Sequence, residues 1–269
     1  MLSVIIPAYN EEKRIKETIR SLVGFLEKEQ PDYELVIVDD GSCDGTLAAA
    51  KFLENDKVRV FSYRDNCGKG HALKFGFEKS RGDVVAFFDA GLDFPPSEIA
   101  DFLRTLEKSG ADLVIGSKRH PESEVVYPWH RRLVSLGAQV LVKLLFGLGV
   151  TDTQVGLKVF RRRVLEKIMP LMLVKRYAFD IELLALAQHY GFKMVEAPVR
   201  LELKLSTAVS FGSLRNCFLD TLSVFYRLKI LKFYDLPTEE RGQLLLEYPV
   251  TVFDRFLVFV LGDVLNRSK

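Results

Sequence analysis

Two pairs of aspartates are the residues in this sequence whose type and spacing best suit a chemical role. Asp39 and Asp40 directly follow one apolar stretch, and Asp89 and Asp93 follow another. Carboxylate oxygens are the ligands that Mg²⁺ and Mn²⁺ prefer, and these ions leave positions that substrate phosphates fill. The same acids also occur in ordinary turns and helix caps. Their occurrence together favours a divalent-metal site, with Asp89 and Asp93 as the catalytic, metal-binding pair.

The apolar stretch Val84–Phe88 is predicted to place this pair at the edge of a sheet. Its unbroken apolar run is typical of a strand that is covered on both faces of a parallel sheet. Pro95 and Pro96 stop the strand region and open the next helix. Ligands of open α/β sheets bind beyond the carboxyl ends of the strands, so we expect the acids to face a substrate.

Strand, turn and helix alternate through the first half of the chain. The predicted strands are Leu2–Pro7, Tyr33–Val38, Val58–Ser62, Val84–Phe88 and Ala111–Gly116. Such β-α units connect through right-handed crossovers, so the pattern predicts the α/β class with a doubly wound, mostly parallel sheet.

The pattern changes near residue 120. We predict a domain of residues 1–205, with halves 1–119 and 120–205, and a helical extension of residues 206–269. The later elements are predicted as a helix over Leu133–Leu148, a loop over Thr151–Lys158, a helix over Tyr177–Tyr190, a strand over Lys193–Val199, and amphipathic or apolar helices over Phe211–Tyr234 and Val250–Leu265. None is apolar over the roughly 20 residues that a bilayer core requires.

Lys69 stands between Gly68 and Gly70 where a helix is predicted to begin. Glycines at a helix N-terminus let backbone N–H groups approach an anion, so this turn indicates a phosphate contact. Its spacing is that of neither a Walker A loop nor a dinucleotide-binding turn.

Composition narrows the partners and the compartment. The net charge of +2, from 38 basic and 36 acidic residues, gives no general attraction for nucleic acid, and we expect no such partner. Three cysteines without a Cys-x-x-Cys pair argue against a disulfide framework or zinc site and fit a reducing compartment. The first residues read as a strand and not as a signal peptide. We therefore expect a cytoplasmic protein.

Several stretches together resemble the GT-A fold glycosyltransferases of family 2. They are Val-Ile-Ile-Pro-Ala-Tyr-Asn-Glu-Glu (4–12), Val-Ile-Val-Asp-Asp-Gly-Ser-Cys-Asp-Gly-Thr (36–46), Asn-Cys-Gly-Lys-Gly-His-Ala (66–72) and Phe-Phe-Asp-Ala-Gly-Leu-Asp-Phe-Pro-Pro (87–96). Residues 151–160 and 176–184 resemble the polyprenyl-phosphate branch, which includes dolichyl-phosphate glucosyl- and mannosyltransferases. The resemblance covers residues 1 to about 200.

This resemblance implies a nucleotide site and a metal. The residues that it implies for the base and ribose are Pro7, Tyr9, Glu11 and Asp40, with Lys69 near the nucleotide. Asp89 belongs to the Asp-x-Asp motif of the family, but the second acid is replaced by Gly91. Asp93 falls where similar mannosyltransferases carry a metal-binding Gln, so we infer that Asp93 supplies the missing carboxylate for Mg²⁺ or Mn²⁺.

A lipid-phosphate acceptor would bring a second anion to the nucleotide sugar, which requires cations between the two. The residues assigned to the acceptor are Arg119, Arg131, Arg132, Gln154 and Lys158, with Arg119 and Arg131 also counted as catalytic. Each single cation could equally belong to a solvated basic face. As a group beside the apolar helix Leu133–Leu148, they favour a lipid phosphate.

The sequence as a whole therefore predicts a metal-dependent, inverting transfer of a hexose, glucose from UDP-glucose, to a polyprenyl or dolichyl phosphate. The protein would be peripheral at the cytosolic face of the membrane. The alternatives are a GDP-mannose-dependent polyprenyl-phosphate mannosyltransferase, a transferase that extends a lipid-linked glycan, and a sugar-nucleotide-binding regulator without catalysis.

Overall fold

The computed structural model describes residues 1–126, 129–176, 178–202 and 211–247; within these ranges the side chains of 126, 129–135, 202, 211, 213 and 245–247 are not described. The chain divides into two compact units, Met1–Thr207 and Ala208–Lys269. All the predicted site residues belong to the first unit.

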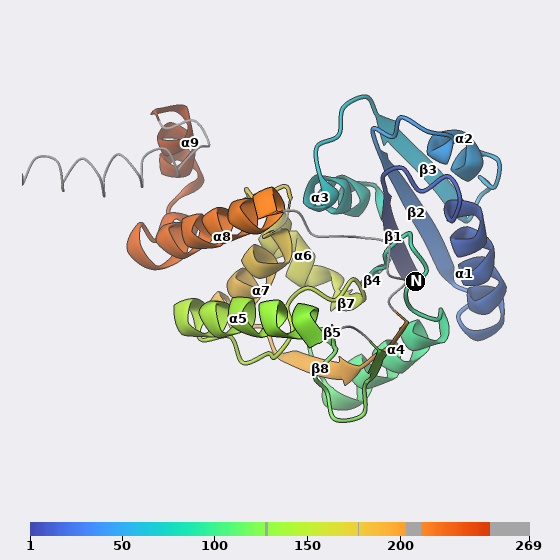
Figure 1. Cartoon of the computed structure of the whole chain (residues 1–269). Coiled ribbons are helices and arrows are strands. Elements are labelled where there is room, and N and C mark those ends of the chain that lie inside the picture. Colours follow the sequence, from blue (N-terminus) through green and yellow to red (C-terminus); the bar gives the residue numbers. More distant parts are fainter. Residues whose placement is uncertain (127–128, 177, 203–210, 248–269) are drawn as a thin grey trace, which may run out of the picture. The chain divides into compact units, whose positions relative to one another are not determined.

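A seven-stranded sheet forms the centre of the first unit, in the order β3-β2-β1-β4-β7-β5-β8 (Figure 1). The strands are β1 (Leu2–Ala8), β2 (Tyr33–Asp40), β3 (Val58–Tyr63), β4 (Val84–Phe87), β5 (Leu113–Ser117), β7 (Lys158–Arg161) and β8 (Met194–Pro198). Neighbouring strands are parallel except that β7 runs antiparallel to β4 and β5. The α/β class and the mostly parallel sheet are confirmed.

Helices cover both faces of this sheet. The elements are α1 (Ile15–Glu29), α2 (Thr46–Lys51), α3 (Lys69–Lys79), α4 (Ser97–Ser109), α6 (Arg162–Ile168) and α7 (Phe179–His189). Val4 and Ile6 of β1 share one core cluster with the buried residues of α1, α2 and α4. On the opposite face Ile5 approaches Gly76 of α3 so closely that a side chain there would clash. Figure 1 shows α1 and α2 on one side of β1 and β2, and α3 on the other.

The strand β7 was not predicted, because the loop was expected to end at Lys158 and residues 159–161 were given no assignment. It is short, and it begins with Lys158 and ends with Arg161, so it lacks the all-apolar run of its neighbours. A second, two-stranded parallel sheet of β6 (Glu124–Val126) and β9 (Arg200–Glu202) was also missed, since three residues give no readable pattern. Both misses lie in the half of the domain where the β-α alternation stops.

The long helix α5 spans Trp129–Phe146, close to its predicted range. In the second unit the predicted helix Phe211–Tyr234 is divided into α8 (Phe211–Phe225), a π-helical turn (Tyr226–Ile230) and a 3₁₀ turn (Phe233–Asp235). A further helix, α9 (Thr238–Glu247), follows, and the predicted helix over Val250–Leu265 lies outside the described residues. Among the described residues, no helix combines the length and apolar character needed to cross a membrane.

Candidate active site

A cleft of about 580 Å³ opens beyond the carboxyl ends of β1, β2 and β4. It collects eight of the residues predicted from sequence: Pro7, Tyr9, Glu11, Asp40, Lys69, Asp89, Asp93 and Gln154. Four polar residues that sequence reasoning did not assign also line it: Arg14, Asn66, Arg176 and Asp180. The order of the strands explains the gathering, because β1 lies between β2 and β4 and all three point the same way.

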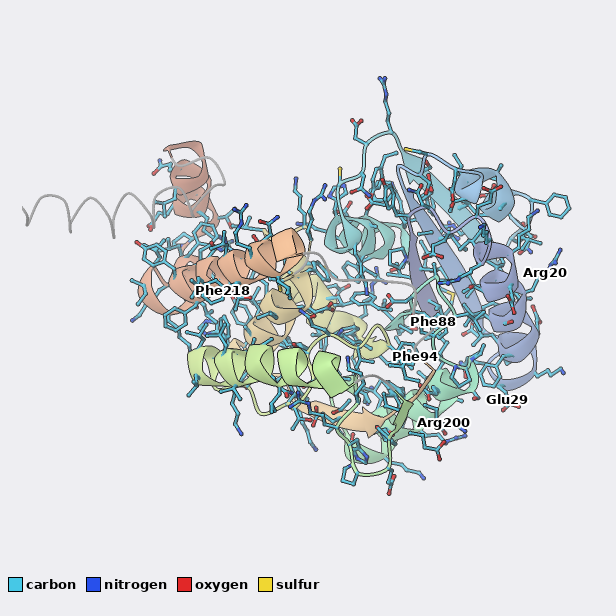
Figure 2. All side chains as sticks on the ribbon, viewed as in Figure 1. Arg20, Glu29, Phe88, Phe94, Arg200 and Phe218 are labelled. Atoms are coloured by element: carbon cyan, nitrogen blue, oxygen red, sulfur yellow. The ribbon has the colours of Figure 1, made fainter. Side chains whose placement is uncertain are left out.

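The loop that carries Asp89 and Asp93 is anchored at both ends by buried aromatic rings. Phe88 and Phe94 are 0% and 4% exposed, and their ring centroids lie 6.5 Å apart in an edge-to-face arrangement (Figure 2). Between them, Leu92 has a left-handed backbone with φ of 55°, an unusual conformation for a branched residue. The two rings thus hold a tight turn that leaves both carboxylates on the cleft wall.

Each oxygen of Asp89 has a defined neighbour. Oδ1 lies 2.6 Å from Nζ of Lys69. Oδ2 lies against Gly156, where a Cβ would overlap the carboxylate. The loop before β7 can therefore come this close to Asp89 only with glycine at position 156. Burial opposes the charged form, but the Lys69 ammonium holds the pKa of Asp89 below its usual range. Asp89 is therefore an ionised carboxylate with one face closed by backbone.

Lys69 reaches the cleft with its side chain, while the backbone beside it is already bonded. The N–H groups of Gly70 and His71 donate to the carbonyl of Lys175 at 2.9 and 3.3 Å. The prediction that this helix start cradles a phosphate with backbone N–H groups is therefore wrong, because a chain segment caps it. Burial opposes the charge of Lys69, but Asp89 raises its pKa, so the lysine is a cation in the cleft.

Asp40 is buried, and both of its oxygens are used to hold the loop before α3. Oδ1 accepts bonds from the Tyr63 hydroxyl and the Cys67 N–H, both at 2.8 Å. Oδ2 accepts bonds from Asn66 Nδ2 at 3.0 Å and the Gly68 N–H at 2.9 Å. A direct contact between this carboxylate and a nucleotide would require one of those bonds to be given up, so the structure shows Asp40 first as a positioning residue.

Two other acids of the region differ from Asp40. Asp39 is 2% exposed, and its Oδ1 has no hydrogen-bond partner among the described residues, whereas Oδ2 accepts a bond from Ser62. Burial raises the pKa of Glu11; Arg14 opposes this, and the charges of Asp93 and Asp89 add to it. Glu11 is thus close enough to both predicted metal ligands to sense their charge.

The carboxylates of the cleft are of a type that fits a divalent metal, but they would supply only some of its ligands. Asp89 and Asp93 offer oxygen donors in one cleft, the ligand type of Mg²⁺ and Mn²⁺. Within the part of the chain that the structure describes, no three acidic, histidine or cysteine side chains are arranged as a complete metal site. Such a donor set suits an ion whose remaining positions belong to substrate phosphates and water.

The predicted acceptor contact of Lys158 is corrected by the structure. Its side chain is 1% exposed, and Nζ donates to the Val155 carbonyl at 2.5 Å and to Asp180 Oδ1 at 2.7 Å. The lysine therefore ties β7 to α7 beneath the cleft. Oδ2 of Asp152, in the loop before β7, lies 3.3 Å from Nζ of Lys118. No local signal in the sequence indicates this ion pair, because β7 is short and carries charged residues at both ends.

None of the three arginines predicted for the acceptor is shown in the cleft. Arg119 is half-buried just beyond β5 and does not line the cleft. Arg131 and Arg132 belong to the first turns of α5, but their side chains lie outside the described residues. Arg176, which was not assigned from sequence, does line the cleft, and its Nη2 donates to the Asn66 carbonyl at 3.1 Å.

Known proteins with similar sequences share one activity class in their names. The sequence profile of the family described as Glycosyl transferase family 2 matches residues 3–169. A human protein named dolichyl-phosphate beta-glucosyltransferase is 36% identical over 247 residues, which cover 86% of this chain and 76% of the human protein. A polyprenol monophosphomannose synthase of Mycolicibacterium smegmatis is 36% identical over 219 residues, or 78% of this chain and 81% of that protein.

Solved structures agree on the fold. Glucosyl-3-phosphoglycerate synthase from Mycobacterium tuberculosis, crystallised with Mn²⁺, uridine diphosphate and phosphoglyceric acid, superposes with a TM-score of 0.66 at 22% identity. The match covers 84% of this chain and 77% of the synthase. At this identity the likeness concerns the architecture of the sheet and its helices.

Proposed function

This chain belongs to glycosyl transferase family 2 and is a glycosyltransferase, and we propose that it transfers glucose from UDP-glucose to a polyprenyl or dolichyl phosphate. One observation carries the proposal. The cleft joins Asp89, Asp93 and Lys69 at the carboxyl edge of the sheet, in a chain 36% identical to a protein named for this reaction. A divalent cation, a phosphate-bearing donor and an anionic acceptor all suit such a site.

The donor half of the reaction rests on the acids and the lysine. Asp89 and Asp93 would hold Mg²⁺ or Mn²⁺, which supplies charge stabilisation for a leaving diphosphate. Three residues of the same cleft, Pro7, Tyr9 and Glu11, are proposed to contact the base and ribose of the nucleotide. Oδ1 of Asp39, a buried oxygen without a hydrogen-bond partner among the described residues, is proposed to accept a ring N–H of the nucleobase.

The acceptor half needs cations more than it needs a base. A phosphate monoester already carries a negative charge near neutral pH, so no hydroxyl has to be deprotonated. We assign Arg119 and Arg131 to the acceptor phosphate, with Arg132 as a third, since arginine contacts two phosphate oxygens at once. Gln154 lies on the cleft wall and is proposed to face the sugar or the acceptor. A single displacement by the phosphate inverts the anomeric carbon.

A matrix of donors and acceptors with the purified full-length chain tests the proposal. We expect glucosyl phosphate lipid only with UDP-glucose, a polyprenyl phosphate and Mg²⁺ or Mn²⁺, with a β linkage by NMR coupling. Transfer from GDP-mannose would replace UDP-glucose as the assigned donor. Transfer to a lipid-linked glycan would replace the polyprenyl phosphate as the assigned acceptor. If no sugar nucleotide is turned over with any acceptor, the remaining assignment is a regulator that binds a sugar nucleotide without catalysis.

The assignment of Arg119 and Arg131 is tested by kinetics in which donor and acceptor are varied separately. Replacing either with Ala is expected to raise the KM for the lipid phosphate about tenfold or more, while the KM for UDP-glucose stays near wild type. This follows because a charge-assisted bidentate contact contributes about 1.5–3 kcal/mol. Equal weakening of the donor would contradict the acceptor role.

The protein is also proposed to lie on a membrane surface at the cytosolic face. Leu136, Val140 and Leu144 of α5 follow at intervals of one helical turn and are 47%, 51% and 79% exposed, next to the exposed Lys143. An apolar stripe flanked by a cation is the pattern of an interfacial helix. Flotation with anionic liposomes should carry the wild-type chain upward and lose a Val140→Asp, Leu144→Asp variant.

Taken by itself, the second unit exposes some charges of its helical segment and buries another. Phe218 is 46% exposed and is labelled in Figure 2. Arg227 is 5% exposed, and its Nε donates to the Tyr234 hydroxyl at 2.9 Å, so it is not available to lipid headgroups. Arg215, Lys229 and Lys232 are exposed and remain candidates for contact with anionic lipids.

A further inference from the structure

The ion pair between Lys69 and Asp89 engages a carboxylate that the proposed metal would also use. Nζ lies 2.6 Å from Oδ1, and the second oxygen, Oδ2, packs so closely on Gly156 that a Cβ there would lie 1.9 Å from it. Gly156 therefore closes one side of Oδ2, and the Lys69 ammonium occupies Oδ1. A divalent cation that binds Oδ1 of Asp89 has to displace this ammonium or share the oxygen with it.

Sharing is unfavourable because two cations on one oxygen repel each other. Displacement is feasible for this side chain. Lys69 is the first residue of α3, and its side chain is 39% exposed, so its four-carbon stem can swing into the cleft. The next acid, Asp180, already accepts a bond from the buried Lys158. An arriving diphosphate would bring a strong anion into the cleft, within reach of a Lys69 ammonium that has left Asp89.

We propose that Lys69 is an exchangeable cation, which holds Asp89 in the empty cleft and passes to the donor diphosphate when a divalent metal takes its place on Asp89. This inference rests on the proposed function, since it assumes a metal and a nucleoside diphosphate in the cleft. It also gives a role to the replacement of the second motif acid by Gly91. With one acid fewer, Lys69 balances the remaining charge until the metal binds.

The exchange predicts opposite effects of one substitution on two ligands. In Lys69→Met, Mn²⁺ alone should bind about fivefold more tightly, because the competing ammonium is gone; an ion pair of this exposure corresponds to roughly such a factor. With saturating Mn²⁺, the nucleoside diphosphate should bind about tenfold more weakly, because the freed cation is missing. A lysine that merely supported the shape of the loop would weaken both.

Binding measurements on the full-length chain test this without any acceptor. Mn²⁺ alone is followed by the electron paramagnetic resonance of the free ion, and UDP or GDP, whichever the wild-type chain binds, by calorimetry with saturating Mn²⁺. Lys118→Met is the matched control, since Lys118 also acts on Asp89 through its charge but pairs with Asp152. We expect Lys69→Arg to stay near wild type for Mn²⁺, and Lys118→Met to change either affinity less than twofold.

Three results would overturn the exchange. They are weaker or unchanged Mn²⁺ binding by Lys69→Met, nucleotide binding that does not depend on Lys69, and an equal gain in Mn²⁺ affinity by Lys118→Met. Absence of Mn²⁺ binding by the wild-type chain, with and without nucleotide, would overturn it as well. Failure of the proposed function would appear elsewhere, as wild-type protein that binds metal and nucleotide but forms no glycosyl phosphate lipid.

Discussion

Gly156 offers the sharpest test of how the active-site geometry is held. In Gly156→Ala the new Cβ would lie 1.9 Å from Oδ2, 2.4 Å from Cγ and 3.0 Å from Oδ1 of Asp89. The clash is with the end of a side chain and not with backbone, so Asp89 can retreat at little cost in stability. To reach an ordinary contact distance it has to move by about 1 Å or more. Misplacement of this size costs about 10²-fold in rate.

We therefore expect kcat/KM of Gly156→Ala to fall about 10²-fold, with Mn²⁺ affinity changed and the free energy of unfolding within about 1 kcal/mol of wild type. Steady-state kinetics, Mn²⁺ titration and urea unfolding measure the three quantities. Gly24→Ala in α1 is the control, because a Cβ there meets nothing within 4 Å. It should keep full activity and gain about 0.5–1 kcal/mol of stability. Wild-type kinetics and Mn²⁺ affinity in Gly156→Ala would refute the reasoning.

Three further outcomes are expected. Asp89→Ala and Asp93→Ala should each lose transfer by about 10³-fold or more at unchanged melting temperature; a near wild-type rate of Asp93→Ala at limiting Mn²⁺ would remove it from the ligands. Lys158→Met should cost about 3–5 kcal/mol in urea unfolding by leaving a buried charge alone, and adding Asp180→Leu should recover most of it. Burial raises the pKa of Glu98 from 4.5 to about 7, although Arg200 opposes this, so the folded state holds a proton that the unfolded state releases. Stability should therefore fall as pH rises from 4.5 to 7, at up to about 1.4 kcal/mol per pH unit, and Glu98→Gln should remove that slope.

Much of the site could be predicted because its residues follow strands with strong patterns. Val84–Phe88 is uniformly apolar, and a parallel strand of this kind ends at the ligand-binding edge of its sheet. Asp40, Asp89 and Lys69 were therefore expected in one place, and they line one cleft. Boundaries of the first three strands were close for the same reason.

Other features required the folded chain. Whether Lys158 meets solvent or a buried acid depends on the antiparallel insertion of β7 between β4 and β5. The four residues of β7 contain no local pattern that predicts this pairing. The capping of α3 by Lys175 joins segments about a hundred residues apart. The close approach of Gly156 to Asp89 likewise joins two distant segments.

The sequence by itself determined the β-α alternation, the acids at the strand ends and the family, since each is written in consecutive residues. Tertiary structure alone decided which charges remain accessible. Asp40, Lys158 and Arg227 are buried and bonded, while Lys69 and Asp89 meet in the open cleft. The physical reason is that the availability of a charged side chain depends on the partners that burial brings to it, and those partners come from strands and helices far away in the chain.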